Sequence, residues 1–149
     1  MRRHLGRDSG QIMLLVLIYA LIAGSLVMVG VDAGSVFLHR RSLAAAADGA
    51  ALAAAQSLDR SAFYRHGADG ALLLDADAAA AAVDAYVDAS DLTGRFDDLT
   101  YDTPVVSADG TTVTVRLHAT AHLPFTGSLT GGRRTVTLDA AASAESTTG

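Results

Sequence analysis

The side chains best suited to chemistry in this sequence are two histidines on one alternating segment. His118 and His122 lie four positions apart in "TTVTVRLHATAHLP", where apolar and polar residues alternate. In a β-strand this spacing puts both side chains on the same face, separated by about 13 Å. One metal ion cannot bridge that distance without other ligands, so we expect surface histidines here and no metal site.

Aspartates recur along a second segment, "DADAAAAAVDAYVDAS", whose spacing predicts a helix over residues 75–90. They form a polar stripe: Asp77, Asp84, Asp88 and Asp91. The pair Asp75 and Asp77 lacks the turn glycine and the closing glutamate of a calcium-binding EF-hand loop. A solvated helix face is therefore the preferred interpretation.

Other catalytic patterns are absent from the sequence. It has no glycine-rich phosphate loop, no serine elbow, no zinc-ligand spacing and, among 149 residues, no cysteine. We expect a protein that is not an enzyme, with no catalytic residues, no cofactor and no metal. Five arginines against two aspartates give residues 1–41 a charge of +3, whereas residues 42–149 carry −8. An acidic body argues against nucleic acid as a partner.

The element that must position everything else is an apolar run near the amino terminus. Residues 12–31, "IMLLVLIYALIAGSLVMVGV", are twenty residues without a charge. As a helix they span roughly 30 Å, the thickness of the hydrocarbon core of a membrane. The apolar region of a cleaved signal peptide is shorter, about 7–15 residues. We therefore expect an uncleaved single-pass anchor in the cytoplasmic membrane, with cleavage and release as the alternative.

Arginines near the run predict its orientation. They are Arg2, Arg3 and Arg7 before it, and Arg40 and Arg41 after it. The denser cluster favours a cytoplasmic amino terminus and an extracytoplasmic carboxyl-terminal domain.

Small and acidic residues in and after the run are candidate contacts. Ala20 and Gly24 are four apart, as are Gly30 and Gly34, and small residues at that spacing let two helices approach closely. The frequency of glycine and alanine in such helices explains the same spacing without any partner. Asp32 is either an ordinary boundary residue or a polar contact to another subunit within the membrane.

After the apolar run the sequence becomes rich in alanine. No proline occurs between residues 36 and 58, and alanine is the best helix former, so one continuous helix is predicted over residues 9–58. One face of it carries small or apolar residues at helical spacing: Leu43, Ala47, Ala50, Ala54 and Leu58. We interpret residues 32–60 as a stiff stalk that packs closely against an assembly or against the chain's own domain.

The amino-terminal segment resembles the TadE/TadG-like proteins of tight-adherence (Flp-type) pilus systems over about a third of the chain. The matching elements are Gly10, Val31-Asp32-Ala33-Gly34, Arg40-Arg41, Leu43 and Ala47-Asp48-Gly49-Ala50-Ala51-Leu52-Ala53-Ala54-Ala55. The resemblance implies a membrane-anchored, minor pilin-like assembly component of such a pilus or of a related type IV-like secretion system. Its partners would be the lipid bilayer and other pilus subunits or platform proteins, in homo- or hetero-oligomers. Some relatives are cleaved after a glycine and carry a glutamate five residues into the mature helix. Leu15 occupies that place here.

The rest of the chain changes from helical to strand periodicity. A loop is expected over residues 59–74, then the helix over residues 75–90, then three strands over residues 99–107, 111–124 and 134–145. Asp109-Gly110 is a hairpin turn signal between the first two strands. The apolar residues expected to face inward are Val113, Val115, Leu117, Ala119, Ala121, Leu123, Val136, Leu138, Ala140 and Ala142.

These elements predict an α+β protein: a long transmembrane helix continuing into a stalk, then a small helix and a three-stranded antiparallel meander. The expected divisions are a basic cytoplasmic segment 1–11, a transmembrane helix 12–31, a stalk 32–60, an exported domain 61–145 and a frayed tail 146–149. In the loop "LPFTGSLTGG", Phe125 and Leu129 either fold over the end of the sheet or form an exposed apolar docking tip. A membrane-tethered binding or sensory module is the alternative function.

Overall fold

The computed structural model describes residues 8–66, 76–125, 127 and 134–145. Several expectations lie outside these residues. They concern Arg2, Arg3, Arg7, the second half of the loop predicted over residues 59–74, Leu129 and the tail 146–149.

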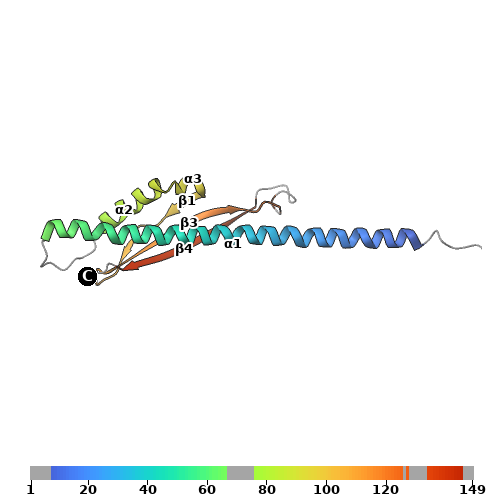
Figure 1. Cartoon of the computed structure of the whole chain (residues 1–149), viewed down its shortest axis with the longest axis horizontal. Coiled ribbons are helices and arrows are strands. Elements are labelled where there is room, and N and C mark those ends of the chain that lie inside the picture. The colour runs from blue at the N-terminus through green and yellow to red at the C-terminus, as the bar shows by residue number, and fades with distance from the viewer. Residues whose placement is uncertain (1–7, 67–75, 126, 128–133, 146–149) are drawn as a thin grey trace, which may run out of the picture.

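The longest element is the amino-terminal helix α1, Asp8–His66, of 59 residues. The prediction of one unbroken helix is correct, but its predicted end at Leu58 is wrong, because residues 59–66 continue the helix. The reason is compositional, since the first glycine or proline past Leu58 is Gly67. Figure 1 shows α1 as a rod whose amino-terminal part stands clear of the other elements, which gather along its carboxyl-terminal part.

Two short helices follow. Helix α2, Ala76–Ala89, confirms the predicted helix to within a residue at each end and buries Ala79, Val83 and Val87. Helix α3, Leu92–Arg95, was not predicted. It begins after Asp91, whose left-handed backbone (φ 47°) turns the chain between the two helices.

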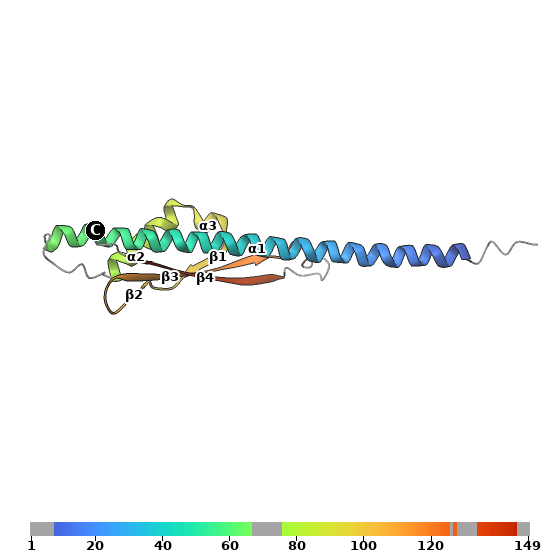
Figure 2. The same cartoon turned by 60° about the horizontal axis from the view of Figure 1, so that its bottom comes forward.

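The sheet is antiparallel and centred on β3, Thr112–His122. Strand β4, Thr135–Glu145, pairs with β3 over its full length, from Thr112 opposite Glu145 to His122 opposite Thr135. Strands β1, Asp97–Tyr101, and β2, Val105–Val106, both pair with the other edge of β3. The sheet lies along one side of α1 (Figure 2).

The sheet has four strands where three were expected, although the α+β class and the antiparallel pairing agree with the prediction. The expected strand over residues 99–107 is divided in two at Pro104, which has no N–H to donate to the ladder. The expected hairpin turn is present between β2 and β3. There Gly110 has φ 70° and its N–H donates to the Ser107 carbonyl at 2.9 Å.

The core is one cluster between α1, α2 and the inner face of the sheet. The predicted inward face of β3 is confirmed, because Val113, Val115, Leu117, Ala119 and Ala121 are all buried. Val136 was expected inward but is 36% exposed. It stands near the end of β4 opposite Ala121, a side chain too small to cover it.

Candidate functional site

The free part of α1 is an exposed apolar rod. From Ile12 to Ile22 every large hydrophobic side chain is exposed. The most apolar window of α1 has a mean hydropathy of 2.8, and none of it is buried. By length and composition this helix is able to cross a membrane.

Gly24 and Gly30, predicted as helix-packing positions, lie within the apolar run of residues 12–31, and Gly34 lies just after it. Apart from chain neighbours and the adjacent backbone of α1 itself, no atom of the described residues lies within 4 Å of the place where a Cβ would stand on Gly24, Gly30 or Gly34. Their small faces are open to a neighbouring helix.

Asp32, at the end of the apolar run, contacts the chain's own β3–β4 connection. Its Oδ1 accepts a hydrogen bond from the backbone N–H of Phe125 at 3.0 Å, and the residue is only 4% exposed. A bond from an N–H to a carboxylate is shorter and stronger than a neutral one. The sequence suggested a boundary residue or a contact to a partner, whereas the structure shows an anchor for a loop 93 residues away. Phe125 itself is 42% exposed.

The alanine face of α1 lies in the chain's own core. Leu43, Ala47, Ala50 and Ala54 are each 0% exposed. Small side chains there allow α2 and the sheet to approach the helix axis. Gly49 shows how close this approach is, because a Cβ on it would stand 2.0 Å from the Tyr86 hydroxyl oxygen.

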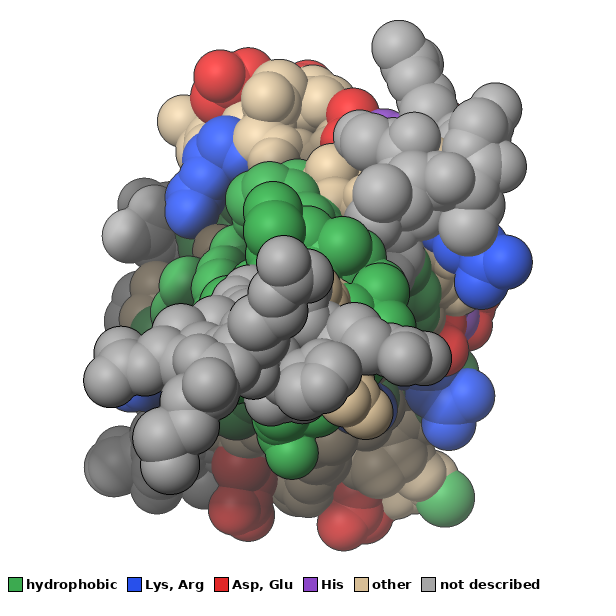
Figure 3. Space-filling view, turned by 90° about the vertical axis from the view of Figure 1, so that its right-hand side faces the viewer, with side chains coloured by type: hydrophobic (Ala, Val, Ile, Leu, Met, Phe, Trp, Pro, Cys, Tyr) green, Lys and Arg blue, Asp and Glu red, His purple; other side chains and the backbone are tan. Residues whose placement is uncertain are grey.

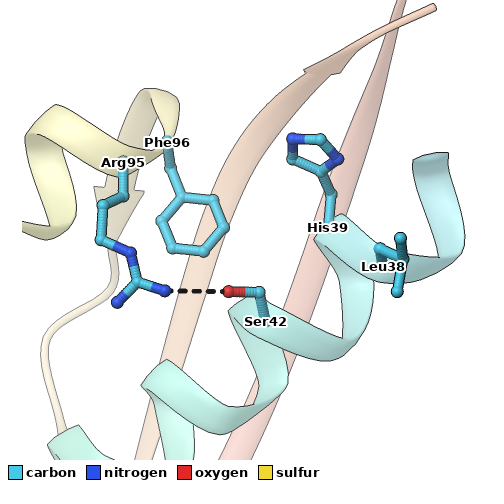
Figure 4. A pocket seen from close by; sticks show the side chains of 5 residues that line it. All are labelled: Leu38, His39, Ser42, Arg95 and Phe96. Atoms are coloured by element: carbon cyan, nitrogen blue, oxygen red, sulfur yellow. Dashed lines mark hydrogen bonds between the residues drawn. The ribbon is translucent and has the colours of Figure 1, made fainter.

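A shallow hollow lies where α3 meets α1, with a volume of about 310 Å³, and its lining is Leu38, His39, Ser42, Arg95 and Phe96 (Figure 4). The Arg95 guanidinium donates to the Ser42 hydroxyl at 3.3 Å and lies 5.9 Å from the centre of the Phe96 ring. The hydrogen bond joins α3 to α1, whereas the cation–π contact links two neighbouring residues at the end of α3. Sequence reasoning missed this group, because its residues come from segments 53 positions apart.

The two histidines each face their own aspartates on the outer side of the sheet. His118 Nδ1 lies 2.6 Å from Asp139 and its Nε2 lies 3.4 Å from Asp102, while His122 Nε2 lies 3.3 Å from Asp97. The hydrogen bond to Asp139, and then the one to Asp102, raise the pKa of His118 above its ordinary value. The two histidines therefore have separate carboxylate partners.

The aspartates that flank His118 lie on opposite ring nitrogens and do not converge on one point. Among the described residues, no three histidine, aspartate or glutamate side chains are grouped so as to hold a metal ion.

Comparison with known proteins finds a family match in the amino-terminal part of the chain. Residues 10–57 match the model of the family described as "Putative Flp pilus-assembly TadE/G-like". This segment is TadE/G-like. The comparisons with curated proteins and with solved structures found no match.

The TadE/G-like segment contains two parts with different surroundings. Its first part is the exposed apolar rod with Gly24 and Gly30. Its second part is the alanine face around Ala50, which packs against α2 and the sheet. Asp32 lies between the two and carries the contact to Phe125. The segment therefore combines a candidate anchor with the helix around which the domain folds.

Proposed function

We propose that this protein is a membrane-anchored, minor pilin-like component that helps to assemble a tight-adherence (Flp) pilus or a related type IV-like secretion system. The observation that carries this proposal is the match of residues 10–57 to a pilus-assembly family. The exposed apolar rod of α1 supports it, because a helix of this composition needs a lipid or helical partner to cover its side chains.

In this proposal α1 crosses the cytoplasmic membrane with its amino terminus inside, and the α+β domain lies outside. Supporting this orientation are the arginines before the apolar run, which outnumber those that follow it. The partners are the lipid bilayer and other pilus subunits or platform proteins.

The mechanism is structural. The apolar rod rests in the bilayer or exchanges lipid for the helix of a neighbouring subunit, and both surroundings suit its exposed side chains. Gly24, Gly30 and Gly34 allow a neighbouring helix to approach closely. The domain then presents its outer surface to the other subunits.

The test is deletion of the gene in the source bacterium, followed by complementation and counting of pili by electron microscopy. We expect the deletion to abolish pili and the wild-type chain to restore them. The double variant Gly24→Leu/Gly30→Leu should insert normally but fail to restore them, because bulk closes the packing face. Val29→Leu, which adds bulk to an exposed position on the opposite side of the rod, should restore them.

Unchanged pili in the deletion strain would overturn the role in assembly. Full restoration by the double glycine variant would overturn only the packing role of the glycines.

A further inference from the structure

We propose that Pro124 and Phe125, which follow β3 at the start of the β3–β4 connection and are called the tip below, sit on the outer surface of the membrane, with the Phe125 ring in the boundary between headgroups and acyl chains. This inference rests on the proposed membrane anchoring and adds to it a second, specific contact with lipid. The domain would then be seated directly on the bilayer and not held away from it on a stalk.

The hydrogen bond to Asp32 fixes the position of Phe125 along the axis of α1. Asp32 is the first charged residue after the apolar run of residues 12–31. In an α-helix the Cα–Cβ bond tilts toward the amino terminus, so the Asp32 carboxylate lies over the preceding, apolar turn. The N–H of Phe125 donates to that carboxylate at 3.0 Å. The backbone of Phe125 is therefore level with the last apolar turn of the helix.

The tip has the chemistry of an interfacial contact. Phe125 is 42% exposed although it is a large aromatic residue, and Pro124 beside it is exposed as well. Aromatic side chains are favoured where hydrocarbon meets the headgroup layer. Asp32 is 4% exposed, so its carboxylate faces the loop and not the lipid. An acidic group at this depth is then compatible with a membrane.

Two arginines on α1 lie within reach of lipid headgroups. Arg40 and Arg41 are exposed on α1, about 12–14 Å beyond Asp32 along the helix axis. Long arginine side chains can extend back toward the headgroups. Figure 3 looks along α1 from its amino-terminal end and shows both arginine and acidic side chains on the domain around the hydrophobic helix. A lipid surface, more than a protein, matches an exposed apolar tip that is level with a membrane anchor.

The experiment uses tryptophan as a depth reporter, because the chain contains none. The full chain is reconstituted in vesicles of phosphatidylcholine and phosphatidylglycerol that contain lipids brominated at a shallow or a deep position. Three single variants are compared: Phe125→Trp at the tip, Tyr19→Trp inside the apolar run, and Leu52→Trp on α1. Leu52 is 53% exposed and about 30 Å beyond Asp32.

We expect shallow bromolipids to quench Phe125→Trp severalfold more than Leu52→Trp, and deep bromolipids to quench Tyr19→Trp. If Tyr19→Trp is quenched but Phe125→Trp behaves like Leu52→Trp, the tip does not touch lipid and the inference is overturned, while anchoring stands. If Tyr19→Trp is not quenched by either lipid, the anchoring itself fails.

A second pair of variants tests the role of Asp32. Combined with Phe125→Trp, Asp32→Ala removes the acceptor and should reduce shallow quenching to the level of Leu52→Trp. Asp32→Asn keeps an oxygen that can accept the bond and should retain the quenching. Equal, undiminished quenching in both combinations would show that this bond does not set the height of the tip.

Discussion

At the scale of single residues, the outer face of the sheet carries a charge cluster that responds to pH. His118 lies between Asp139 on β4 and Asp102, which follows β1, so it joins the two outer strands through the central one. Arg116 and Asp139 line the surface beside it. A protonated imidazole donates to both carboxylates, whereas a neutral one donates to only one.

This cluster predicts that stability decreases as the pH rises. The pKa of His118 is raised above 6.5 in the folded protein, chiefly by its hydrogen bond to Asp139. Its contribution is therefore fully present below about pH 6 and is lost as the pH passes through the raised value. We expect the midpoint of thermal unfolding, measured in detergent by circular dichroism, to fall between pH 6 and pH 8.

The control is His118→Gln, which cannot titrate and should reduce that fall markedly. Any residual slope belongs to other groups. If the wild type and His118→Gln show the same pH dependence, His118 does not stabilise the sheet through its charge.

At the scale of elements, α1 serves two environments in one unbroken helix. Its exposed part carries large apolar side chains, whereas its buried part is mostly alanine. Large side chains suit lipid, which adapts to any shape, while small ones allow α2 and the sheet to pack at a short distance. The approach of Tyr86 to Gly49 is one example of this close packing.

The alanine face predicts sensitivity to added volume. Ala50 is 0% exposed, and Ala50→Leu preserves helix propensity while forcing bulk into the core, which should destabilise the domain by about 1–3 kcal/mol. The matched control is Ala45→Leu on the exposed side of the same helix, with an expected effect within about 0.5 kcal/mol. Urea unfolding in detergent measures both. Equal unfolding midpoints would mean that α1 does not pack against α2 and the sheet as described.

At the scale of the whole molecule, the structure has a free apolar end and a folded domain on one helix. This arrangement makes the orientation of the chain in the membrane testable independently of any pilus. Alkaline phosphatase fused after Gly149 should be active, and the activity should sediment with membranes, because the proposed orientation exports the domain.

The control for this prediction removes the arginines that precede the apolar run. Replacing Arg2, Arg3 and Arg7 with glutamine should lower phosphatase activity severalfold, since orientation follows the distribution of basic residues. An inactive fusion on the wild-type chain would reverse the proposed topology. Activity recovered mainly in soluble fractions would contradict the uncleaved anchor.

The sequence by itself determined the features that depend on neighbouring residues. The apolar run of residues 12–31, the unbroken helix, the helix over residues 76–89 and the inward face of β3 follow from composition and periodicity. Local patterns suffice for these because helix propensity and the alternation of a strand act over a few positions. The TadE/G-like match falls in the same locally encoded part of the chain.

Only the tertiary structure decided which surfaces meet. From the sequence alone, the face containing Ala50 was predicted to pack against either an assembly or the chain's own domain. The fold buries this face in the domain. Asp32 contacts Phe125 across 93 positions, and Arg95 contacts Ser42 across 53. Such pairs depend on how the chain folds back on itself, because residues far apart in sequence are brought together by packing and no local pattern records which of them will meet.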